Sequence, residues 1–122
     1  MTTYFEADVT TIGPEVELML EDNILILFNE TATEDLKEIA VIHNAQGISG
    51  EIEPGDEFVI DDHAYKILFV GGKANETMKD LGHATLQFNG EEDSDMPGTI
   101  CLENGPNNNI SEDSKIQFRK RN

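Results

Sequence analysis

The sequence predicts one all-β domain, a barrel or a sandwich, over residues 1–122. Its apolar residues fall in short blocks rich in β-branched and aromatic side chains, and turn signals separate the blocks about every eight to twelve residues. A chain of 122 residues is long enough to bury one core. Hydrophobic residues make up 38% of the chain and never form a membrane-length run, so no direct membrane insertion is expected.

The first third of the chain has the patterns of three strands and one short helix. Residues 3–11 and 24–29 are strand-like, with alternating or continuous apolar side chains. Thr33 offers an N-cap hydroxyl before two acidic residues, which predicts one or two helical turns that run to about Glu38. The apolar run 39–43 then predicts a buried strand.

A β-hairpin is predicted in the middle of the chain. Residues 53–56 have the turn sequence Glu-Pro-Gly-Asp, and after them Phe58 and Ile60 alternate with acidic residues. The apolar strand 65–70 returns beyond the polar turn 61–64. This spacing is typical of hairpins in small barrels.

The pattern changes from strand to helix between Lys73 and Leu81, where apolar residues recur at spacings of three and four. Gly82 is placed to end this helix. The next strand is predicted to begin at His83, and its side chains alternate between two faces. The polar face carries His83, Thr85 and Gln87, and the apolar face carries Ala84, Leu86 and Phe88.

The last quarter of the chain is predicted to contain two strands and two loops. Residues 90–98 form an acidic loop, and residues 104–109 separate strands at 99–103 and 115–119. Cys101, the single cysteine, permits no internal disulfide. We interpret it as a small buried hydrophobe rather than as a catalytic thiol.

The charge of the chain excludes some partners. Twenty-five acidic and eight basic residues give a formal net charge of −17, which disfavours nucleic acid and anionic membrane surfaces. The basic cluster Arg119-Lys120-Arg121 is interpreted as a solvated end. The acidity has two open interpretations, solubility or steering toward a positively charged protein partner. Because the first ten residues lack the features of a secretory signal, a cytoplasmic location is expected.

The three histidines are the remaining candidates for chemistry, because the phosphate-binding, serine-hydrolase, zinc-protease and C-x-x-C motifs are absent. His63 lies in the hairpin turn and receives little functional weight. His43 and His83 each lie at a strand end, from which a ring can reach a pocket mouth. Base rates favour a structural role for each. No local pair has zinc-ligand spacing, so neither a metal nor a cofactor is predicted.

Two imidazoles also suit phosphoryl transfer, because a neutral ring nitrogen can attack phosphorus while a second ring orients the phosphoryl oxygens. Several short motifs follow one another along nearly the whole chain: Ile42-His43, Glu53-Pro54-Gly55 leading to Phe58, Tyr65 followed by Val70-Gly71, Leu81-Gly82-His83-Ala84-Thr85-Leu86 with Phe88, and Pro97-Gly98-Thr99. Together they resemble the glucitol/sorbitol-specific enzyme IIA component of the bacterial phosphoenolpyruvate-dependent sugar phosphotransferase system.

The resemblance implies a small closed β-barrel with one or two short helical insertions. It implies that His43 is phosphorylated, because the family's phosphorylated histidine follows an apolar strand and an isoleucine. The donor would be the phosphocarrier HPr, and the acceptor the enzyme IIB part of an IIB/IIC permease for glucitol or sorbitol. The resemblance also implies a place near the site for His83, as a phosphate-orienting partner.

Two other hypotheses stay open at this point. The first is a non-catalytic regulatory or binding module that keeps the same fold. The second, more distant, is a metal-binding barrel. The choice among hexitols lies in the permease, so no residue of this chain predicts which one is transported.

Overall fold

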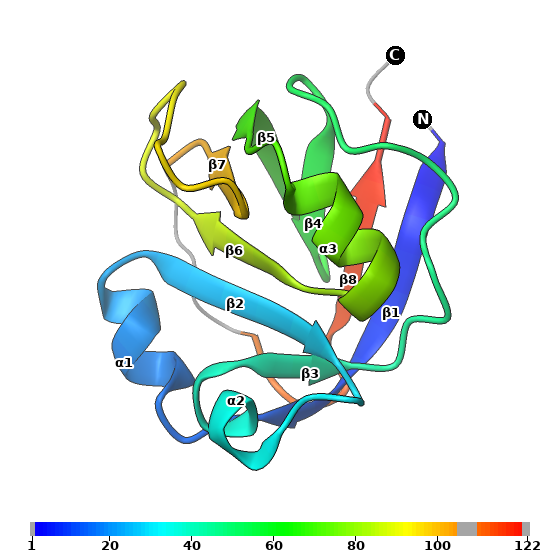
Figure 1. Cartoon of the computed structure of the whole chain (residues 1–122), viewed down its shortest axis with the longest axis vertical. Coiled ribbons are helices and arrows are strands. Elements are labelled where there is room, and N and C mark those ends of the chain that lie inside the picture. Colours follow the sequence, from blue (N-terminus) through cyan, green and yellow to red (C-terminus); the bar gives the residue numbers. More distant parts are fainter. Residues whose placement is uncertain (1, 105–109, 121–122) are drawn as a thin grey trace.

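The computed structural model describes residues 2–104 and 110–120, and over these residues eight strands close into one β-barrel with three short helices (Figure 1). The order around the barrel is β1-β3-β2-β6-β7-β5-β4-β8. This confirms the predicted closed all-β barrel, with three helices where one or two were expected. The strands are β1 (Thr3–Ile12), β2 (Ile24–Asn29), β3 (Val41–His43), β4 (Glu57–Ile60), β5 (His63–Val70), β6 (Ala84–Gln87), β7 (Thr99–Leu102) and β8 (Lys115–Arg119). The helices are α1 (Val16–Glu21), α2 (Glu34–Ile39) and α3 (Ala74–Leu81).

The barrel mixes two kinds of strand pairing. Among the described strands, β2 and β3 are parallel, as are β6 and β7, and the other neighbours are antiparallel. A parallel pair needs a crossover connection. The chain crosses between β2 and β3 through α2, and between β6 and β7 through residues 88–98, which include the predicted acidic loop 90–98. β8 closes the barrel between β1 and β4.

The core of the barrel is an aromatic cluster centred on Phe118, which is fully buried. Its ring centroid lies 5.0 Å from that of Phe58, 5.4 Å from that of Phe5 and 6.4 Å from that of Tyr4. These residues come from β1, β4 and β8, so the cluster joins the three strands that close the barrel.

A second, smaller apolar cluster lies on the outer face of β2 and β3, under α2. It contains Phe28 and Ile42, which are cross-strand partners, and Leu36 of α2 packs against it. The Thr33 hydroxyl accepts a hydrogen bond from the Leu36 amide at 3.4 Å, as the N-cap prediction requires. The helix extends through Ile39, so β3 begins at Val41 and not at residue 39.

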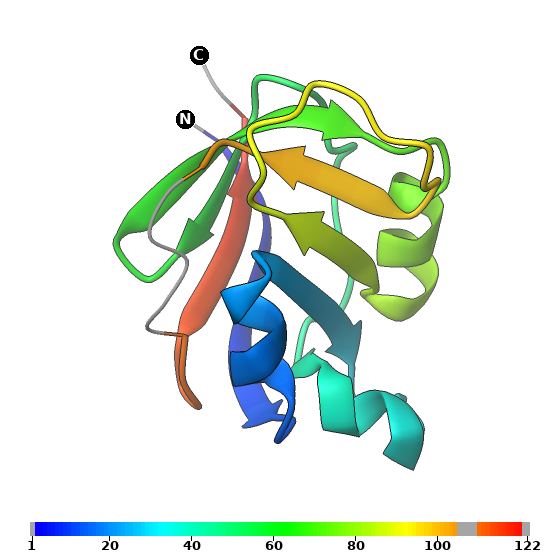
Figure 2. The same ribbon diagram turned by 90° about the vertical axis from the view of Figure 1, so that its left-hand side faces the viewer.

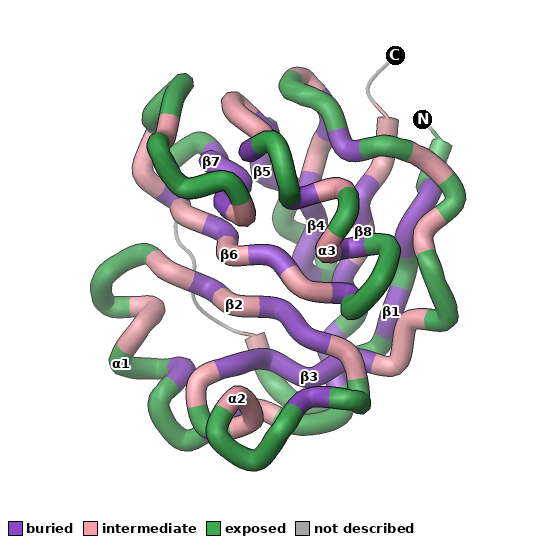
Figure 3. Tube along the Cα trace, in the orientation of Figure 1, coloured by how far each residue is buried: buried purple, intermediate pink, exposed green. Residues whose placement is uncertain are grey.

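Helix α3 lies at the end of the barrel where β5 ends and β6 begins, away from α1 and α2 (Figures 1 and 2). Its residues Ala74 and Met78 pack on the barrel core. It ends where predicted, because Gly82 takes a left-handed conformation with φ 59° and donates its amide to the Met78 carbonyl. Ladder pairing in β6 begins at Ala84, one residue later than expected, and alternate residues are buried from there on (Figure 3).

Helix α1 has no start signal in the sequence, and the structure shows why. Glu15 is at the N-cap but makes no side-chain capping hydrogen bond, and Leu18 is 59% exposed. Neither a cap nor a full apolar stripe therefore marks the helix. The hairpin of β4 and β5 is confirmed, but Ile60 pairs with His63, so β5 begins at His63 and not at residue 65. Cys101 is buried as predicted, and this burial raises the pKa of its thiol.

The interpretation of the basic cluster as a solvated end is wrong for its two described members. Arg119 Nε donates to Glu57 Oε1 at 2.8 Å, and Lys120 Nζ donates to Glu53 Oε1 at 2.7 Å and Asp56 Oδ2 at 3.1 Å. Both cations therefore tie β8 to the start of the hairpin. Arg121 and most of the predicted loop 104–109 lie outside the described residues.

Candidate functional site

His43 is the last residue of β3, and its ring points into the barrel. Strand alternation directs Val41 and His43 inward and Ile42 outward to the second cluster. All three residues of β3 are buried, as the colouring of this strand in Figure 3 shows. The exposed fraction of His43 is 0%. Its ring meets that of Phe5 edge to face, with centroids 5.4 Å apart and planes at 85°. The aromatic cluster of the core therefore forms one wall of the histidine site.

Both ring nitrogens of His43 have backbone partners. Nε2 lies 2.8 Å from the Gly82 carbonyl oxygen, and Nδ1 accepts a hydrogen bond from the Ala45 amide at 3.2 Å. The first contact ties the histidine to the end of α3, and the second ties it to the segment that follows β3. The two backbone groups that fix the ring orientation thus belong to residues 39 positions away and two positions away along the chain.

Gly82 serves this site by having no side chain. A Cβ atom at Gly82 would lie 2.6 Å from Cε1 and 2.8 Å from Nε2 of His43, and its φ of 59° already favours glycine. The residue therefore ends α3 and lets its own carbonyl approach the ring. The first role is predicted by the sequence, and the second is not.

Burial lowers the pKa of His43 below the ordinary histidine value of 6.5, because the charged ring would lose its hydration. The bond to the Gly82 carbonyl and the charge of Glu30 oppose this shift without reversing it. His43 is therefore neutral at physiological pH. A neutral imidazole keeps a lone pair on one nitrogen, which is the form able to act as a nucleophile.

The fold is expected to lose stability as the pH falls below about 6.5, the value at which histidines of the unfolded chain titrate. Burial lowers the pKa of both His43 and His83 in the folded chain, so below this pH the unfolded chain binds more protons. The free energy of unfolding then rises with pH and levels off above 6.5. Urea unfolding from about pH 5 to 8 measures the slope, which His43→Gln should reduce. An unchanged slope in His43→Gln, equal to that of the exposed His63→Gln control, would contradict the expectation.

A cavity of about 150 Å³ adjoins the partners of His43. Its walls come from β1, the end of β2, the segment after β3 and the end of α3. Among the residues that line it, Lys79 supplies a positive charge and Asp80 a negative one. The lining residues are Phe5, Asn29, Ala45, Gln46, Gly47, Met78, Lys79, Asp80 and Gly82. The cavity thus adjoins Ala45 and Gly82, the two partners of the buried ring, and its wall includes one ammonium and one carboxylate.

His83 follows Gly82 directly, but its ring lies on the other face of the sheet. Its ring centroid is 5.0 Å from that of Phe28, which belongs to the outer cluster. Burial lowers the pKa of His83, and its carbonyl accepts a hydrogen bond from the Thr77 hydroxyl at 2.7 Å. The structure therefore brings the His43 ring to the residue next to His83, while the two imidazoles face opposite ways.

His63, the third histidine, is exposed at the first position of β5 and is not among the cavity-lining residues. Phe5 and Lys79 are parts of the site that the sequence did not predict. A strand-like phenylalanine carries no signal of its own, and Lys79 was assigned only to a helix.

No group of three or more histidine, cysteine, aspartate or glutamate side chains within residues 2–104 and 110–120 is arranged to hold a metal ion. Within the same ranges, no helix has the length and apolar composition that crossing a membrane requires.

Comparison with known proteins defines the class. A solved structure, the PTS system IIA component from Enterococcus faecalis V583, matches with a TM-score of 0.81 at 30% identity and covers 93% of this chain and 98% of that one. The barrel is thus that of a phosphotransferase-system IIA component. Proteins from Shigella flexneri and Escherichia coli (strain K12), each described as a PTS system glucitol/sorbitol-specific EIIA component, are 33% identical over 118 residues, or 97% of this chain and 96% of theirs.

The family model for the PTS system glucitol/sorbitol-specific IIA component matches residues 4–117. The chain belongs to this family. It is accordingly a phosphotransferase component that carries a phosphoryl group between an upstream and a downstream member of the relay. The resemblance found in the sequence is therefore confirmed.

Proposed function

We propose that His43 carries the phosphoryl group in this protein, that phospho-HPr is its donor, and that the enzyme IIB part of an IIB/IIC permease for glucitol or sorbitol is its acceptor. Residues 1–122 would act as one IIA domain in this relay. The observation that carries the proposal is that the His43 imidazole is neutral and is oriented by contacts with two backbone groups. The residues that hold it, Ala45 and Gly82, line a small cavity whose wall includes the Lys79 ammonium. These are the parts that reversible phosphorylation of a ring nitrogen requires.

The chemistry follows from the properties of the ring and its surroundings. The lone pair of a neutral ring nitrogen attacks phosphorus, and the resulting nitrogen–phosphorus bond is labile enough for the group to be passed on. Lys79 lines the cavity and offers a positive charge to the incoming phosphoryl oxygens. The net charge of −17 favours encounter with a donor and an acceptor whose docking surfaces carry basic groups.

We include His83 as an assisting residue. Its backbone is continuous with the Gly82 carbonyl that holds His43, and its half-buried ring lies beside the sheet that carries β3. For the ring to orient phosphoryl oxygens it must leave Phe28. A rate measurement on His83→Gln tests this role directly.

Incubation with phosphoenolpyruvate, enzyme I and HPr is expected to add one phosphoryl group to the chain, and His43→Gln is expected to remain unlabelled. The reason is that glutamine keeps an amide donor toward the Gly82 carbonyl but has no nucleophilic nitrogen. Intact mass spectrometry under non-acidic conditions measures the added group. A second incubation with the purified IIB part then measures its transfer.

His63→Gln is the matched control, because His63 is exposed and lies away from the cavity. It should label like the unchanged chain. His83→Gln should still label, but more slowly, and an unchanged rate would remove His83 from the proposal. Labelling that persists in His43→Gln would overturn the assignment of His43, and absence of labelling in the unchanged chain would favour the non-catalytic module.

A further inference from the structure

Asn29, the last residue of β2, lies beside His43 in the barrel wall. The two residues are partners across the parallel strands β2 and β3. Strand alternation directs Phe28 outward to the second cluster, so the side chain of Asn29 lies on the inner face, as the His43 ring does. A Cβ atom at Gly82 would lie 2.8 Å from His43 Nε2 and 3.2 Å from Asn29 Cβ. Asn29 is therefore a neighbour of the ring edge that faces Gly82.

The Oδ1 atom of Asn29 is held by Thr31. It accepts hydrogen bonds from the Thr31 amide at 2.9 Å and from the Thr31 hydroxyl at 2.5 Å. A backbone amide can only donate, so the side-chain atom that faces it must be the carbonyl oxygen and not the nitrogen. Asparagine commonly forms this contact with the amide two residues further on. The contact fixes the orientation of the whole planar side-chain amide, including Nδ2.

The Nδ2 atom of Asn29 has hydrogens available for a ligand. Among residues 2–104 and 110–120, none accepts a hydrogen bond from it. The buried side-chain nitrogen and oxygen atoms of the same residues all have partners, so an Nδ2 without one must be open to solvent. Asn29 also lines the cavity of about 150 Å³ beside the partners of His43. Its amide is thus fixed on one side and available to donate on the other.

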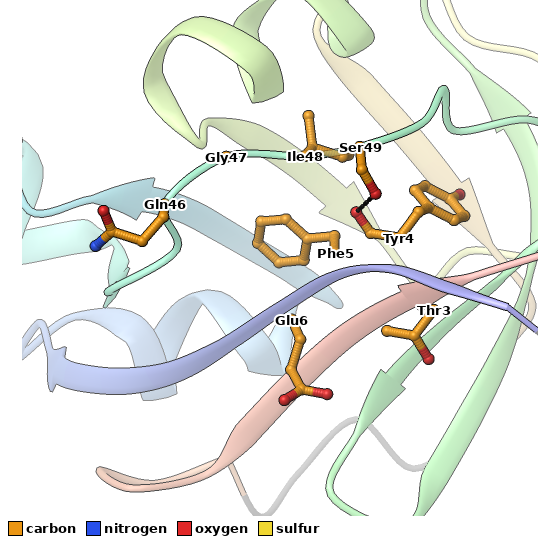
Figure 4. A pocket seen from close by; sticks show the side chains of 8 residues that line it. All are labelled: Thr3, Tyr4, Phe5, Glu6, Gln46, Gly47, Ile48 and Ser49. Carbon is orange, nitrogen blue, oxygen red and sulfur yellow. Dashed lines mark hydrogen bonds between the residues drawn. The ribbon is translucent and has the colours of Figure 1, made fainter.

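Asn29 is the side-chain donor of this cavity that the fold holds in place. The other two lining side chains with N–H groups, Gln46 and Lys79, belong to exposed residues. Figure 4 shows the Gln46 side chain directed away from the ring of Phe5, which also lines the cavity. The side chain of Asn29 is short, and the residue is half-buried. A donor that is already oriented stabilises developing charge without the cost of being ordered first.

The cavity suits a phosphoryl group in size and in charge. A volume of 150 Å³ is the space of roughly five water molecules, and a phosphoryl group has only one phosphorus and three terminal oxygens. Lys79 forms no ion pair with a carboxylate of the described chain, so its charge is available to an anion. Asp80, in the same wall, opposes an anion. A neutral donor such as Asn29 therefore adds attraction that the single ammonium does not supply alone.

We propose that Asn29 Nδ2 donates a hydrogen bond to a terminal oxygen of the phosphoryl group on His43, and that Thr31 is the positioning residue for this amide. The proposal rests on the proposed function of His43 and adds a residue that binds the transferred group. During transfer the ring lone pair forms the bond to phosphorus, the nitrogen–phosphorus bond of the donor breaks, and its electron pair returns to the donor nitrogen. The terminal oxygens move with the phosphorus into the cavity. An interaction that forms only as they arrive lowers the barrier.

Proton–nitrogen NMR of the isotope-labelled full chain tests the contact without a substitution. When the relay phosphorylates the chain, one of the two Nδ2 protons of Asn29 is expected to move downfield, because it then donates to an anionic oxygen. Asn75 is the internal reference, because its side-chain amide already donates to the Ile52 carbonyl at 3.0 Å. A phosphorylated chain in which the Asn29 protons shift no more than those of Asn75 would overturn the proposal and leave the assignment of His43 intact. A chain that takes up no phosphoryl group would instead overturn the proposed function.

An Asn29→Asp variant tests the contact by rate. Aspartate keeps an oxygen for Thr31 but has no Nδ2 hydrogens. Its labelling by phosphoramidate, a small donor that needs no docking surface, is expected to be about tenfold slower than that of the unchanged chain, because a hydrogen bond to a charged group is lost. Asn44→Asp is the matched control. It adds the same charge next to His43 and keeps the oxygen that accepts the Asp8 amide at 2.9 Å, but residue 44 does not line the cavity.

The control separates the lost donor from the added charge. Asn44→Asp should label like the unchanged chain, and equal slowing in the two aspartate variants would exclude the Asn29 contact. Slowing of Asn29→Asp with phospho-HPr but not with phosphoramidate would also contradict the proposal, since it would assign Asn29 to the docking of the donor protein. The NMR spectrum of each variant shows whether it folds. If Asn29→Asp does not, the shift of the Asn29 protons in the unchanged chain decides.

Thr31→Val and Thr31→Ser test the positioning role. Valine removes the hydroxyl that donates to Asn29 Oδ1 and leaves the backbone amide in place, so labelling is expected to be about threefold slower. Serine keeps the hydroxyl and should label like the unchanged chain. The downfield shift of the Asn29 proton should weaken in the valine variant and return in the serine variant. A valine variant with an unchanged rate and an unchanged shift would show that Thr31 does not position the amide.

Discussion

A Gly82→Ala variant is expected to accept the phosphoryl group at least about tenfold more slowly than the unchanged chain. The added Cβ would lie 2.6 Å from Cε1 of His43, which forces the ring or the end of α3 to move and disturbs the bond from Nε2 to the Gly82 carbonyl. The left-handed conformation adds a stability cost of about 1–2 kcal/mol. The initial rate of labelling and the urea midpoint measure the two effects.

Gly72→Ala is the matched control, because no atom lies within 4 Å of the position of its Cβ and its backbone does not require glycine. It should label at the rate of the unchanged chain and shift stability by no more than about 0.5 kcal/mol. Equal labelling rates in the two alanine variants would show that the close approach of Gly82 to His43 does not matter for the reaction.

A Phe118→Ala variant is expected to lose about 3–5 kcal/mol of the free energy of unfolding, the usual cost of removing a buried phenylalanine. Phe118 is fully buried, and its ring contacts those of Phe5 and Phe58 with centroid distances of 5.4 and 5.0 Å. Because Phe5 also contacts His43, the cavity left by the lost ring should loosen the site as well. Urea unfolding measures the loss.

Gln117→Ala controls for the strand position. Its side chain lies on the outer face of β8, where it donates to Glu6 at 2.8 Å in an exposed hydrogen bond. The expected change is about 0.5 kcal/mol or less. A loss in Phe118→Ala no larger than this would mean that the aromatic cluster does not hold the barrel closed.

The sequence predicted those elements whose signals are local. Thr33 and Gly82 mark helix ends by capping chemistry, and both act there in the structure. The alternation in β6 predicted which side chains are buried, because a strand with one face on a core must alternate. The start of β3 was wrong by two residues, because Ile39 is as suitable for the apolar face of α2 as for a buried strand.

What the sequence could not predict depends on contacts between distant segments. The parallel pairing of β2 with β3 and of β6 with β7 has no local signal, since each strand alone has the same pattern in either direction. The site follows the same rule. His43 could be selected by its place after an apolar strand and by the family resemblance, but its burial and its bond to Gly82 arise only when β3 meets the end of α3.

The closure of the barrel by β8 sets an order for folding during synthesis. Cross-strand partners in β1 and β8 are far apart along the chain, as Glu6 and Gln117 are, separated by 111 positions. A chain is made from its N-terminus, so β1 keeps an unpaired edge until residues 115–119 have left the ribosome. The ring of Phe118 arrives with that last strand and completes the wall behind Phe5. The packing around His43 is therefore completed late in synthesis. A nascent chain does not present the folded phosphoryl-acceptor site before β8 is in place.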